Sequence, residues 1–520
     1  MGELKPANQN PWYVLMMQFG EQTGDEIDWD LHEKNREAWN RRHHGKLSDS
    51  ANDAFREFGL PFPSKNRYRA EPMVLEKPFP ELYKIRNGET CDIPSPPKLF
   101  DPIEFRYHHF EHLICASGMI FPNGLAFDNC RFSRHLDLRQ TGVVDDLRMS
   151  KCTLEQQLDA EKLFVTGGLR INRSSLGGLD LNGAKVSDDI EMVNIKVQGP
   201  TNLADVQVEQ NLRVVDAKLT EEFACTSLEV RGTSYFANLK VSGATYFQRA
   251  TFEKASNWQL SRFGGDVTFA GSQFKGQARF RAVTFETRVG FEACQFDGMT
   301  DFAESQFLGQ GTPQLAVIRF NDSGFAKPTS FRHCVFTQSF PEFTNVDFHP
   351  VTDFTAETKN WPDQIVEPQK EARETCGIIR NLLTKKGLHE DQHFFFRLEM
   401  NFAAAQSDPL KRLTYWIYEL LSDYGDSIQR PVIGLALVWA LGFAAFRGYF
   451  SSSGAHNIWT AMGLSFSNLF PLFGFGRLHL DKVYDSLPQA LTALSGFQTV
   501  VSLPLLFFLG LGLRQRFRVR

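Results

Sequence analysis

Large apolar residues recur in this chain with a period of eleven, in steps that alternate between five and six residues. The most regular run is Phe236, Val241, Phe247, Phe252, Trp258, Phe263, Phe269, Phe274, Phe280, Phe285, Phe291, Phe296, Phe302 and Phe307. A helix repeats about every 3.6 residues and a strand every two, so neither accounts for this spacing. A fixed period over many copies indicates a repeat architecture.

Small residues form a second layer of the pattern, two positions before every other large anchor. They are Ala250, Ser261, Ser272, Cys294 and Ser305, with the larger Val283 as an exception. A large and a small residue that both point inward from a five-residue unit can fill a narrow tube, if the chain turns a corner after each unit. Four such sides make a coil of about 22 residues, and coils stack at the strand spacing of about 4.8 Å.

This pattern resembles the pentapeptide repeat family, whose members form right-handed, four-sided parallel β-helices. The anchors here are mostly Phe rather than Leu, and every second unit carries a sixth residue. The pattern extends from Phe105 to Phe354, with a slip near Leu176 and an insertion around Gly311–Arg319. We therefore expect a mainly β fold, with a solenoid of some eleven coils and about 55 Å over residues 101–354. Residues 1–100 are expected to cap its open end, because terminal repeats must be shielded.

Charge and cysteine content argue against several functions. The net charge is −5, and residues 101–354 hold 31 acidic and 25 basic side chains, a balance that does not imitate the field of a DNA duplex. No nucleic-acid partner is expected. The eight cysteines include no CxxC pair, and several occupy the small-residue position of the repeat, so they are interpreted as buried structural thiols. The sequence suggests no cofactor.

Residues 355–429 change to a helical period and are expected to form a connector. Glu367–Lys386 and Leu388–Gln406 are predicted to be two helices that meet at Gly387. The second helix contains His389-Glu390-Asp391-Gln392-His393, a formal match to the HExxH motif, in which His389 and His393 could bind zinc and Glu390 could act as a general base. Asp391 stands where metalloproteases keep an uncharged residue, and a solvated helix face is the alternative.

Residues 430–520 carry two long apolar segments and are interpreted as a transmembrane domain. Val432–Phe446, extended to Phe450, and Leu487–Leu513 are each long enough to span a bilayer. Pro504 is expected to kink the second span and is our candidate for a gating kink. Leu410–Leu421 before the first span is amphipathic, which suits a helix lying on a membrane surface.

Basic residues flank the two spans on their outer sides. Lys411, Arg412 and Arg430 precede the first span, and Arg514, Arg516, Arg518 and Arg520 follow the second. By the positive-inside rule, both termini and the β-helix are expected in the cytoplasm, with the spans in a bacterial inner membrane.

The segment between the spans resembles the pore loop of two-span channels. Ile458–Phe470 is apolar, rich in small residues and short for a span, and a glycine-rich turn follows it. The candidate pore loop is Pro471, Leu472, Phe473, Gly474, Phe475, Gly476 and Arg477. Gly474-Phe475-Gly476 resembles the Gly-aromatic-Gly of potassium filters, in which backbone carbonyls replace the hydration shell of the ion. A ring of Arg477 side chains would instead favour anions. The alternative is an interfacial hairpin that packs the spans together in an oligomer.

As a whole, the chain resembles bacterial membrane-anchored pentapeptide repeat proteins that end in two spans with an ion-channel-like loop. The resemblance implies a non-enzymatic, oligomeric, channel-like membrane protein. Two spans cannot enclose a water path, so a pore requires several subunits, and a tetramer is our expectation. Its partners would be membrane lipid, further copies of itself, ions, and a cytoplasmic protein bound to the β-helix. The alternatives are a membrane-tethered scaffold for protein–protein interaction and the HExxH zinc hydrolase.

Overall fold

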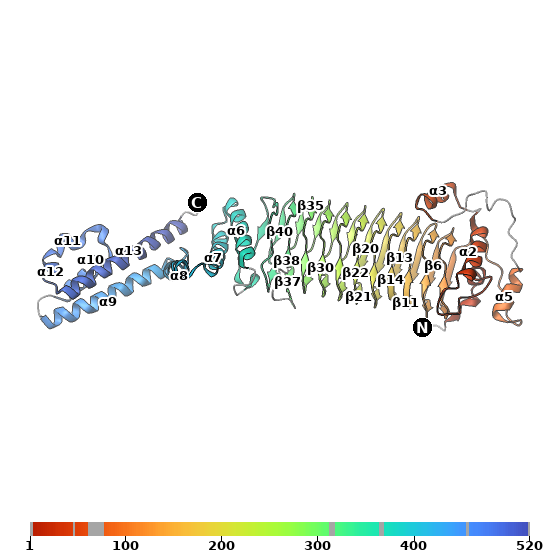
Figure 1. Ribbon diagram of the computed structural model, residues 1–520, viewed down its shortest axis with the longest axis horizontal. Helices are drawn as coiled ribbons and strands as arrows, with labels where there is room; N and C mark the ends of the chain where they lie inside the picture. Colours follow the sequence, from red (N-terminus) through yellow and green to blue (C-terminus); the bar gives the residue numbers. More distant parts are fainter. Residues whose placement is uncertain are drawn as a thin grey trace. The chain divides into compact units, whose positions relative to one another are not determined.

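A computed structural model of the chain describes residues 4–44, 47–60, 77–310, 318–362, 369–453 and 457–517. These residues form two compact units, Met1–Glu371 and Ala372–Arg520. The first unit contains the strands and the second contains the long apolar helices (Figure 1).

The first unit is a parallel β-solenoid with four rows of short strands per coil (Figure 1). The rows run from β2 (Ile103–Arg106) to β42 (Asp353–Phe354), from β3 (His108–Phe110) to β41 (Val335–Phe336), from β4 (Ile114–Cys115) to β38 (Ile318–Arg319), and from β5 (Ile120–Phe121) to β39 (Gly324–Phe325). The first row holds twelve strands and therefore encloses eleven coils. The prediction of a four-sided parallel β-helix of about eleven coils is confirmed.

The register shows where the repeat is regular and where it changes. Most neighbours are 22 residues apart, as Leu125 and Leu147 are. The slip expected near Leu176 is a β-bulge: β11 (Thr153–Asp159) carries one residue more than β14 (Ser175–Asp180), because Leu154 pairs with Leu176 but Gln157 with Gly178. Phe296 pairs with Phe325, 29 residues later, so the predicted insertion adds seven residues to this coil; residues 311–317 lie outside the described residues.

Stacked aromatic rings fill the first coils and the coils from Phe223 onward, whereas aliphatic side chains fill the coils between Leu169 and Leu219. Phe247, Phe269 and Phe291 lie on successive coils with ring centroids 5.1 and 4.8 Å apart and planes within 7° of parallel. Trp258 and Phe280 stack in the same way in the neighbouring column. These spacings follow the distance between strands, and parallel rings at this distance are offset rather than face to face. The eleven-residue period of Phe in the sequence therefore follows from the stacking of these rings in the core.

The small residues two positions before the anchors form a hydrogen-bonded ladder. The hydroxyl of Ser305 donates to the carbonyl of Phe280 and accepts from the backbone N–H of Val283, 22 residues earlier. Ser261 makes the equivalent pair of bonds to Phe236 and Leu239. Serine is therefore tolerated at the small-residue position of the repeat, because backbone groups of the preceding coil form hydrogen bonds with its hydroxyl.

The N-terminal elements pack near the start of the solenoid and on one another. They are β1 (Lys5–Pro6), η1 (Ala7–Gln9), α1 (Pro11–Met16), α2 (Trp29–His44), α3 (Asp49–Glu57) and α5 (Phe79–Asn87). Strand β1 pairs in parallel with β3 and adds one strand to its row. The indole N–H of Trp39 donates to the carbonyl of Ile120 at 2.7 Å, and the Asn40 side chain accepts from the backbone N–H of the same residue. These contacts satisfy backbone groups at the start of the solenoid.

The second unit is helical. Its elements are α6 (Gln369–Lys385), α7 (His389–Ala405), α8 (Pro409–Ser422), α9 (Gln429–Ser453), α10 (Ile458–Leu469), η3 (Pro471–Phe473), α11 (Phe475–His479), α12 (Asp481–Asp485) and α13 (Gln489–Phe517). Helices α6 and α7 meet at Gly387, whose φ of 74° is a left-handed conformation that glycine adopts without strain. The predicted start of the first helix at Glu367 lies outside the described residues.

Candidate functional site among the apolar helices

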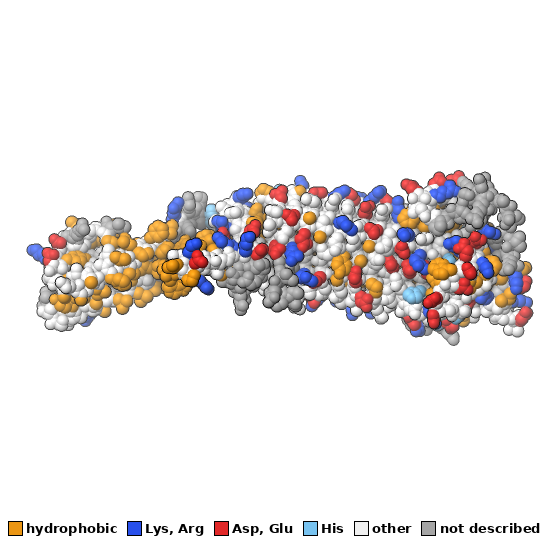
Figure 2. Space-filling model, in the orientation of Figure 1, with side chains coloured by type: hydrophobic (Ala, Val, Ile, Leu, Met, Phe, Trp, Pro, Cys, Tyr) orange, Lys and Arg blue, Asp and Glu red, His pale blue; other side chains and the backbone are white. Residues whose placement is uncertain are grey.

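Helices α9 and α13 are long and apolar enough to cross a membrane. The most apolar 18-residue segment of α9 has a mean hydropathy of 1.6, and that of α13 has 1.8. Only 17% of the α9 segment and 22% of the α13 segment are buried. A helix of 25 residues is about 37 Å long and exceeds the hydrocarbon core of about 30 Å. Hydrophobic side chains gather over these helices (Figure 2). The sequence therefore located two candidate spans correctly.

Helix α10 is too short to cross. Its 12 residues extend about 18 Å, roughly half of the hydrocarbon thickness. It packs against both α9 and α13. The Ser465 hydroxyl of α10 donates to the Trp439 carbonyl of α9, and the Asn468 side chain in its last turn donates to Gln498 of α13. The order along the chain is therefore a span-length helix, a half-length helix, a turn and a second span-length helix.

A buried polar network fixes the end of α10. The Asn468 side-chain Nδ2 donates to Gln498 Oε1 at 2.9 Å, and Asn468 Oδ1 accepts from the hydroxyls of Tyr484 and Ser495. Gln498 Nε2 donates to the Val438 carbonyl at 2.8 Å and to Ser465 Oγ at 3.1 Å. Asn468 and Gln498 are 4% and 2% exposed, so their polar groups depend on one another for hydrogen bonds.

Gly442 on α9 makes room for this network. A Cβ at this position would lie 1.8 Å from Gln498 Nε2, so any larger residue would displace the Gln498 side chain. A Cβ on Gly448 of the same helix would meet no other atom within 4 Å, so this residue is free of the constraint. Gly442 is thus required by packing, and Gly448 offers a matched control.

The candidate pore loop takes the form of a turn and a short helix. Pro471–Phe473 is a 3-10 helix, Gly474 is left-handed with a φ of 68°, and α11 begins at Phe475. The carbonyls of Gly474 and Gly476 accept backbone N–H groups of Leu478 and Leu480 at 3.2 and 2.9 Å. In this conformation they do not form the extended row of free carbonyls found in a potassium filter. The side chains of Leu472 and Arg477 lie outside the described residues, and the role of this loop stays a prediction.

Pro504 lies inside α13, which continues through it. Proline lacks an N–H, so the carbonyl one turn earlier, that of Val500, loses its usual partner within the helix. This leaves α13 locally weaker at Pro504, while gating at this position remains a prediction.

The connector is joined to the first span by an ion-paired junction. Asp423, at the end of α8, accepts from Arg397 of α7 at 3.0 Å and lies 3.7 Å from Arg430 of α9. Arg430 also donates to the carbonyl of Glu419 at 2.6 Å. One carboxylate therefore contacts side chains from the helices on either side of it. On α8 itself, the exposed large apolar residues are Leu410, Leu413, Trp416, Ile417 and Leu420, a face that suits a membrane surface.

The HExxH residues lie at the start of α7. His389 is exposed and its Nδ1 is 3.4 Å from Gln392 Oε1. His393 is more buried, and its Nδ1 is 3.8 Å from Asp426. Among the described residues, no group of three or more His, Cys, Asp or Glu is placed to hold a metal ion. The structure therefore supplies no third ligand within the region it describes.

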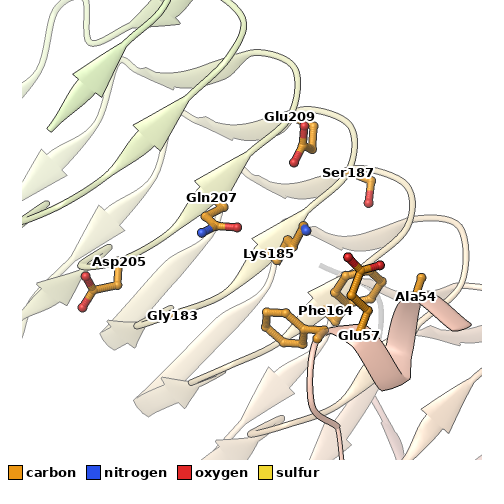
Figure 3. A pocket seen from close by; sticks show the side chains of 10 residues that line it. Ala54, Glu57, Phe164, Gly183, Lys185, Ser187, Asp205, Gln207 and Glu209 are labelled. Carbon is orange, nitrogen blue, oxygen red and sulfur yellow. The ribbon is translucent and has the colours of Figure 1, made fainter. Parts of the chain in front are cut away.

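An open pocket of about 460 Å³ lies between α3 and one face of the solenoid. Figure 3 shows Glu57 on α3, with Lys185, Gln207 and Glu209 on neighbouring coils. Phe164, which packs with Phe55 of α3, forms its apolar floor. The lining carries Ser187, Lys185 and the carboxylates of Glu57, Asp205 and Glu209, and within the described ranges no group of these carboxylates is placed to hold a metal ion.

The sequence interpretation missed the polar network. Ser495, Gln498 and Ser502 are spaced by three and four residues on the second apolar segment, and Ser465 and Asn468 by three on the short one. Polar residues on one face of an apolar helix usually face the interior of a helix bundle. That spacing was the available signal, and all five side chains are buried in the structure.

The comparison with protein families supports the repeat. A model described as pentapeptide repeats (9 copies) matches residues 236–284. No curated protein and no solved structure matches the chain. Fold and comparison together define a pentapeptide-repeat β-solenoid that is followed by two helices able to span a membrane.

Proposed function

We propose that this chain is a non-enzymatic membrane protein that assembles, through its two spans, into a channel-like oligomer. The observation that supports this is α10, a half-length helix that packs against two span-length helices and is hydrogen-bonded to Trp439 of α9 and Gln498 of α13. This is the layout of two-span pore domains, which the sequence resembles. Two spans cannot enclose a water path, so the pore is formed between several copies, and we propose four.

In this proposal the membrane is a bacterial inner membrane with the solenoid in the cytoplasm. Arg430 in the first turn of α9 and Arg514 near the end of α13 belong to the basic flanks that favour both outer ends on the cytoplasmic side. The Arg397–Asp423–Arg430 junction connects the helical connector to α9. A displacement of α7 is thereby coupled to the first span, and Pro504 gives α13 a point at which to bend.

The turn after α10 lines the pore in our proposal. Gly474 and Gly476 carry no side chain in this turn, and Arg477 contributes a positive charge from each subunit. A ring of such charges attracts anions and repels cations. Opening would require the turn to rearrange, because the Gly474 and Gly476 carbonyls accept backbone hydrogen bonds in the structure.

Ion flux from the purified protein in sealed liposomes tests the proposal. We expect chloride flux that falls in Gly474→Ala and reverses its ion preference in Arg477→Glu, beside an oligomeric mass in detergent. A monomer without flux contradicts the proposal. A tethered scaffold would tolerate both substitutions, and a zinc enzyme would respond to chelation instead.

A further inference from the structure

Opposite charges pair between neighbouring coils over most of the solenoid surface. Pairs are formed by Arg131 with Glu155, Arg231 with Glu209, Lys275 with Glu253, Arg281 with Glu304 and Arg288 with Asp266, at distances of 2.5 to 2.7 Å. The partners are 22 to 24 residues apart, which is about one coil. In these pairs each charge faces its opposite on the next coil, whereas like charges on neighbouring strands destabilise a sheet.

Like charges do meet in register at Arg148 and Arg170 and at Asp137 and Asp159, but Asp146 pairs with both of these arginines and Arg139 with both of these aspartates. Within the described ranges, one row of lysines has no such counter-charge. Lys196 pairs in register with Lys218, and Lys218 with Lys240, on β17 (Lys196–Val197), β21 (Lys218–Leu219) and β25 (Lys240–Val241). We call these three residues the lysine ladder. Their Cα atoms follow the strand spacing of about 4.8 Å along the solenoid. The ladder thus presents three like charges in a line parallel to the stack of coils.

The ladder is exposed and is not neutralised by the residues around it. All three lysines are exposed. Across the described part of the chain, no carboxylate comes within 4.0 Å of any of their ammonium groups; the next cation in the row, Arg262 on β29 (Arg262–Phe263), is paired with Glu286. Glu221 follows Lys218 by three residues without forming a pair. Three stacked cations therefore remain available to an external anion.

The residues beside the ladder indicate which kind of anion fits. Two positions away on either side, the same coils carry Asn194, Gln198, Asp216, Thr220, Asn238 and Ser242. These side chains include no aromatic ring on which a nucleic-acid base could stack and no large apolar group that could enter a lipid layer. Lysine is also a compact point charge and lacks the planar fork with which arginine binds phosphate bidentately.

We propose that the lysine ladder is a docking surface for an extended acidic segment, rich in Asp and Glu, of a partner protein. Such a segment would lie along the stack of coils, with its carboxylates against the three ammonium groups and its backbone beside the polar side chains that flank them. Attraction of this kind sets the rate and register of docking and weakens with salt. The proposal concerns the solenoid alone and does not depend on channel activity.

Fluorescence anisotropy of the full-length protein in neutral detergent provides the test. The probe is a labelled peptide of about ten glutamates, which spans roughly 33 Å when extended. We expect binding at about 50 mM salt that is lost at about 500 mM. Replacing Lys196, Lys218 and Lys240 together by Gln should weaken binding about tenfold. A carbodiimide cross-link to the peptide should map to these lysines.

A matched triple variant distinguishes the effect of the lysine ladder from the effect of removing three positive charges. Arg231→Gln, Lys275→Gln and Arg281→Gln remove three exposed cations that are already paired with carboxylates. We expect this variant to bind the peptide within about threefold of the unmodified protein. If both triple variants weaken binding of the peptide equally, the proposal is overturned. So does ladder-dependent binding of polyphosphate or of phosphatidylglycerol vesicles without binding of the peptide. Circular dichroism of both variants verifies that the solenoid is folded.

Discussion

Gly442→Ala should weaken the packing of α10 against α9 and α13. A Cβ on Gly442 would fall 1.8 Å from Gln498 Nε2 and 2.4 Å from its Cδ, so the side chain must move. Gln498 then loses its bonds to Val438, Ser465 and Asn468. Hydrogen bonds between membrane helices average about 0.6 kcal/mol, so three of them amount to about 2 kcal/mol, or roughly thirtyfold in the unfolding equilibrium.

Gly448→Ala is the matched control, because nothing lies within 4 Å of its added Cβ. Both substitutions replace glycine by alanine within α9, so the gain in helix propensity cancels in the comparison. The assay is unfolding in mixed micelles with increasing dodecyl sulfate, followed by tryptophan fluorescence. We expect Gly442→Ala to be about 2 kcal/mol less stable than Gly448→Ala, and expect Gln498→Ala to abolish most of that difference. Equal stability of the two variants would refute the packing that we describe.

Three further predictions concern the first unit. Phe280→Ala, in the stacked core, should lower the free energy of unfolding of the solenoid by about 3–5 kcal/mol in guanidinium titrations followed by circular dichroism, whereas Leu260→Ala on the surface should change it by less than about 0.5 kcal/mol. At pH 8 a maleimide should label only Cys91 in the native protein, because the other cysteines are buried; rapid labelling of a second thiol would contradict the core. Burial lowers the pKa of His43 from 6.5 to about 4, so the unfolded chain binds more protons between these values. The N-terminal elements should therefore lose up to about 3 kcal/mol as the pH falls from 6.5 to 4, and His43→Phe should remove that slope from Trp fluorescence measurements.

The solenoid could be predicted from sequence because each anchor belongs to a local unit of five or six residues. Phe236 to Phe307 report the core directly, and the slip near Leu176 marks a real bulge. The lysine ladder also becomes readable once the coil length is known, since Lys196, Lys218 and Lys240 are 22 residues apart. In a solenoid, the repeat length therefore predicts which residues lie next to one another on neighbouring coils, as well as the secondary structure.

The polar network could not be predicted in the same way. Asn468 and Gln498 are 30 residues apart and belong to different helices, so only packing brings them together. The Gly474–Gly476 motif was visible in the sequence, but a short motif does not determine its backbone conformation. Gly474 is left-handed and precedes a helix here, and three residues cannot specify whether such a turn straightens in an assembly.

Single-channel recording of a purified oligomer of known mass tests the central claim most directly. The protein would be reconstituted in planar bilayers and compared with Arg477→Glu under a chloride gradient. We predict discrete currents that prefer anions in the unmodified protein and cations in the variant, because the sign of the charge at this turn is reversed. Silent bilayers that contain a verified oligomer, or currents whose reversal potential is the same in both proteins, would contradict a pore lined by this turn.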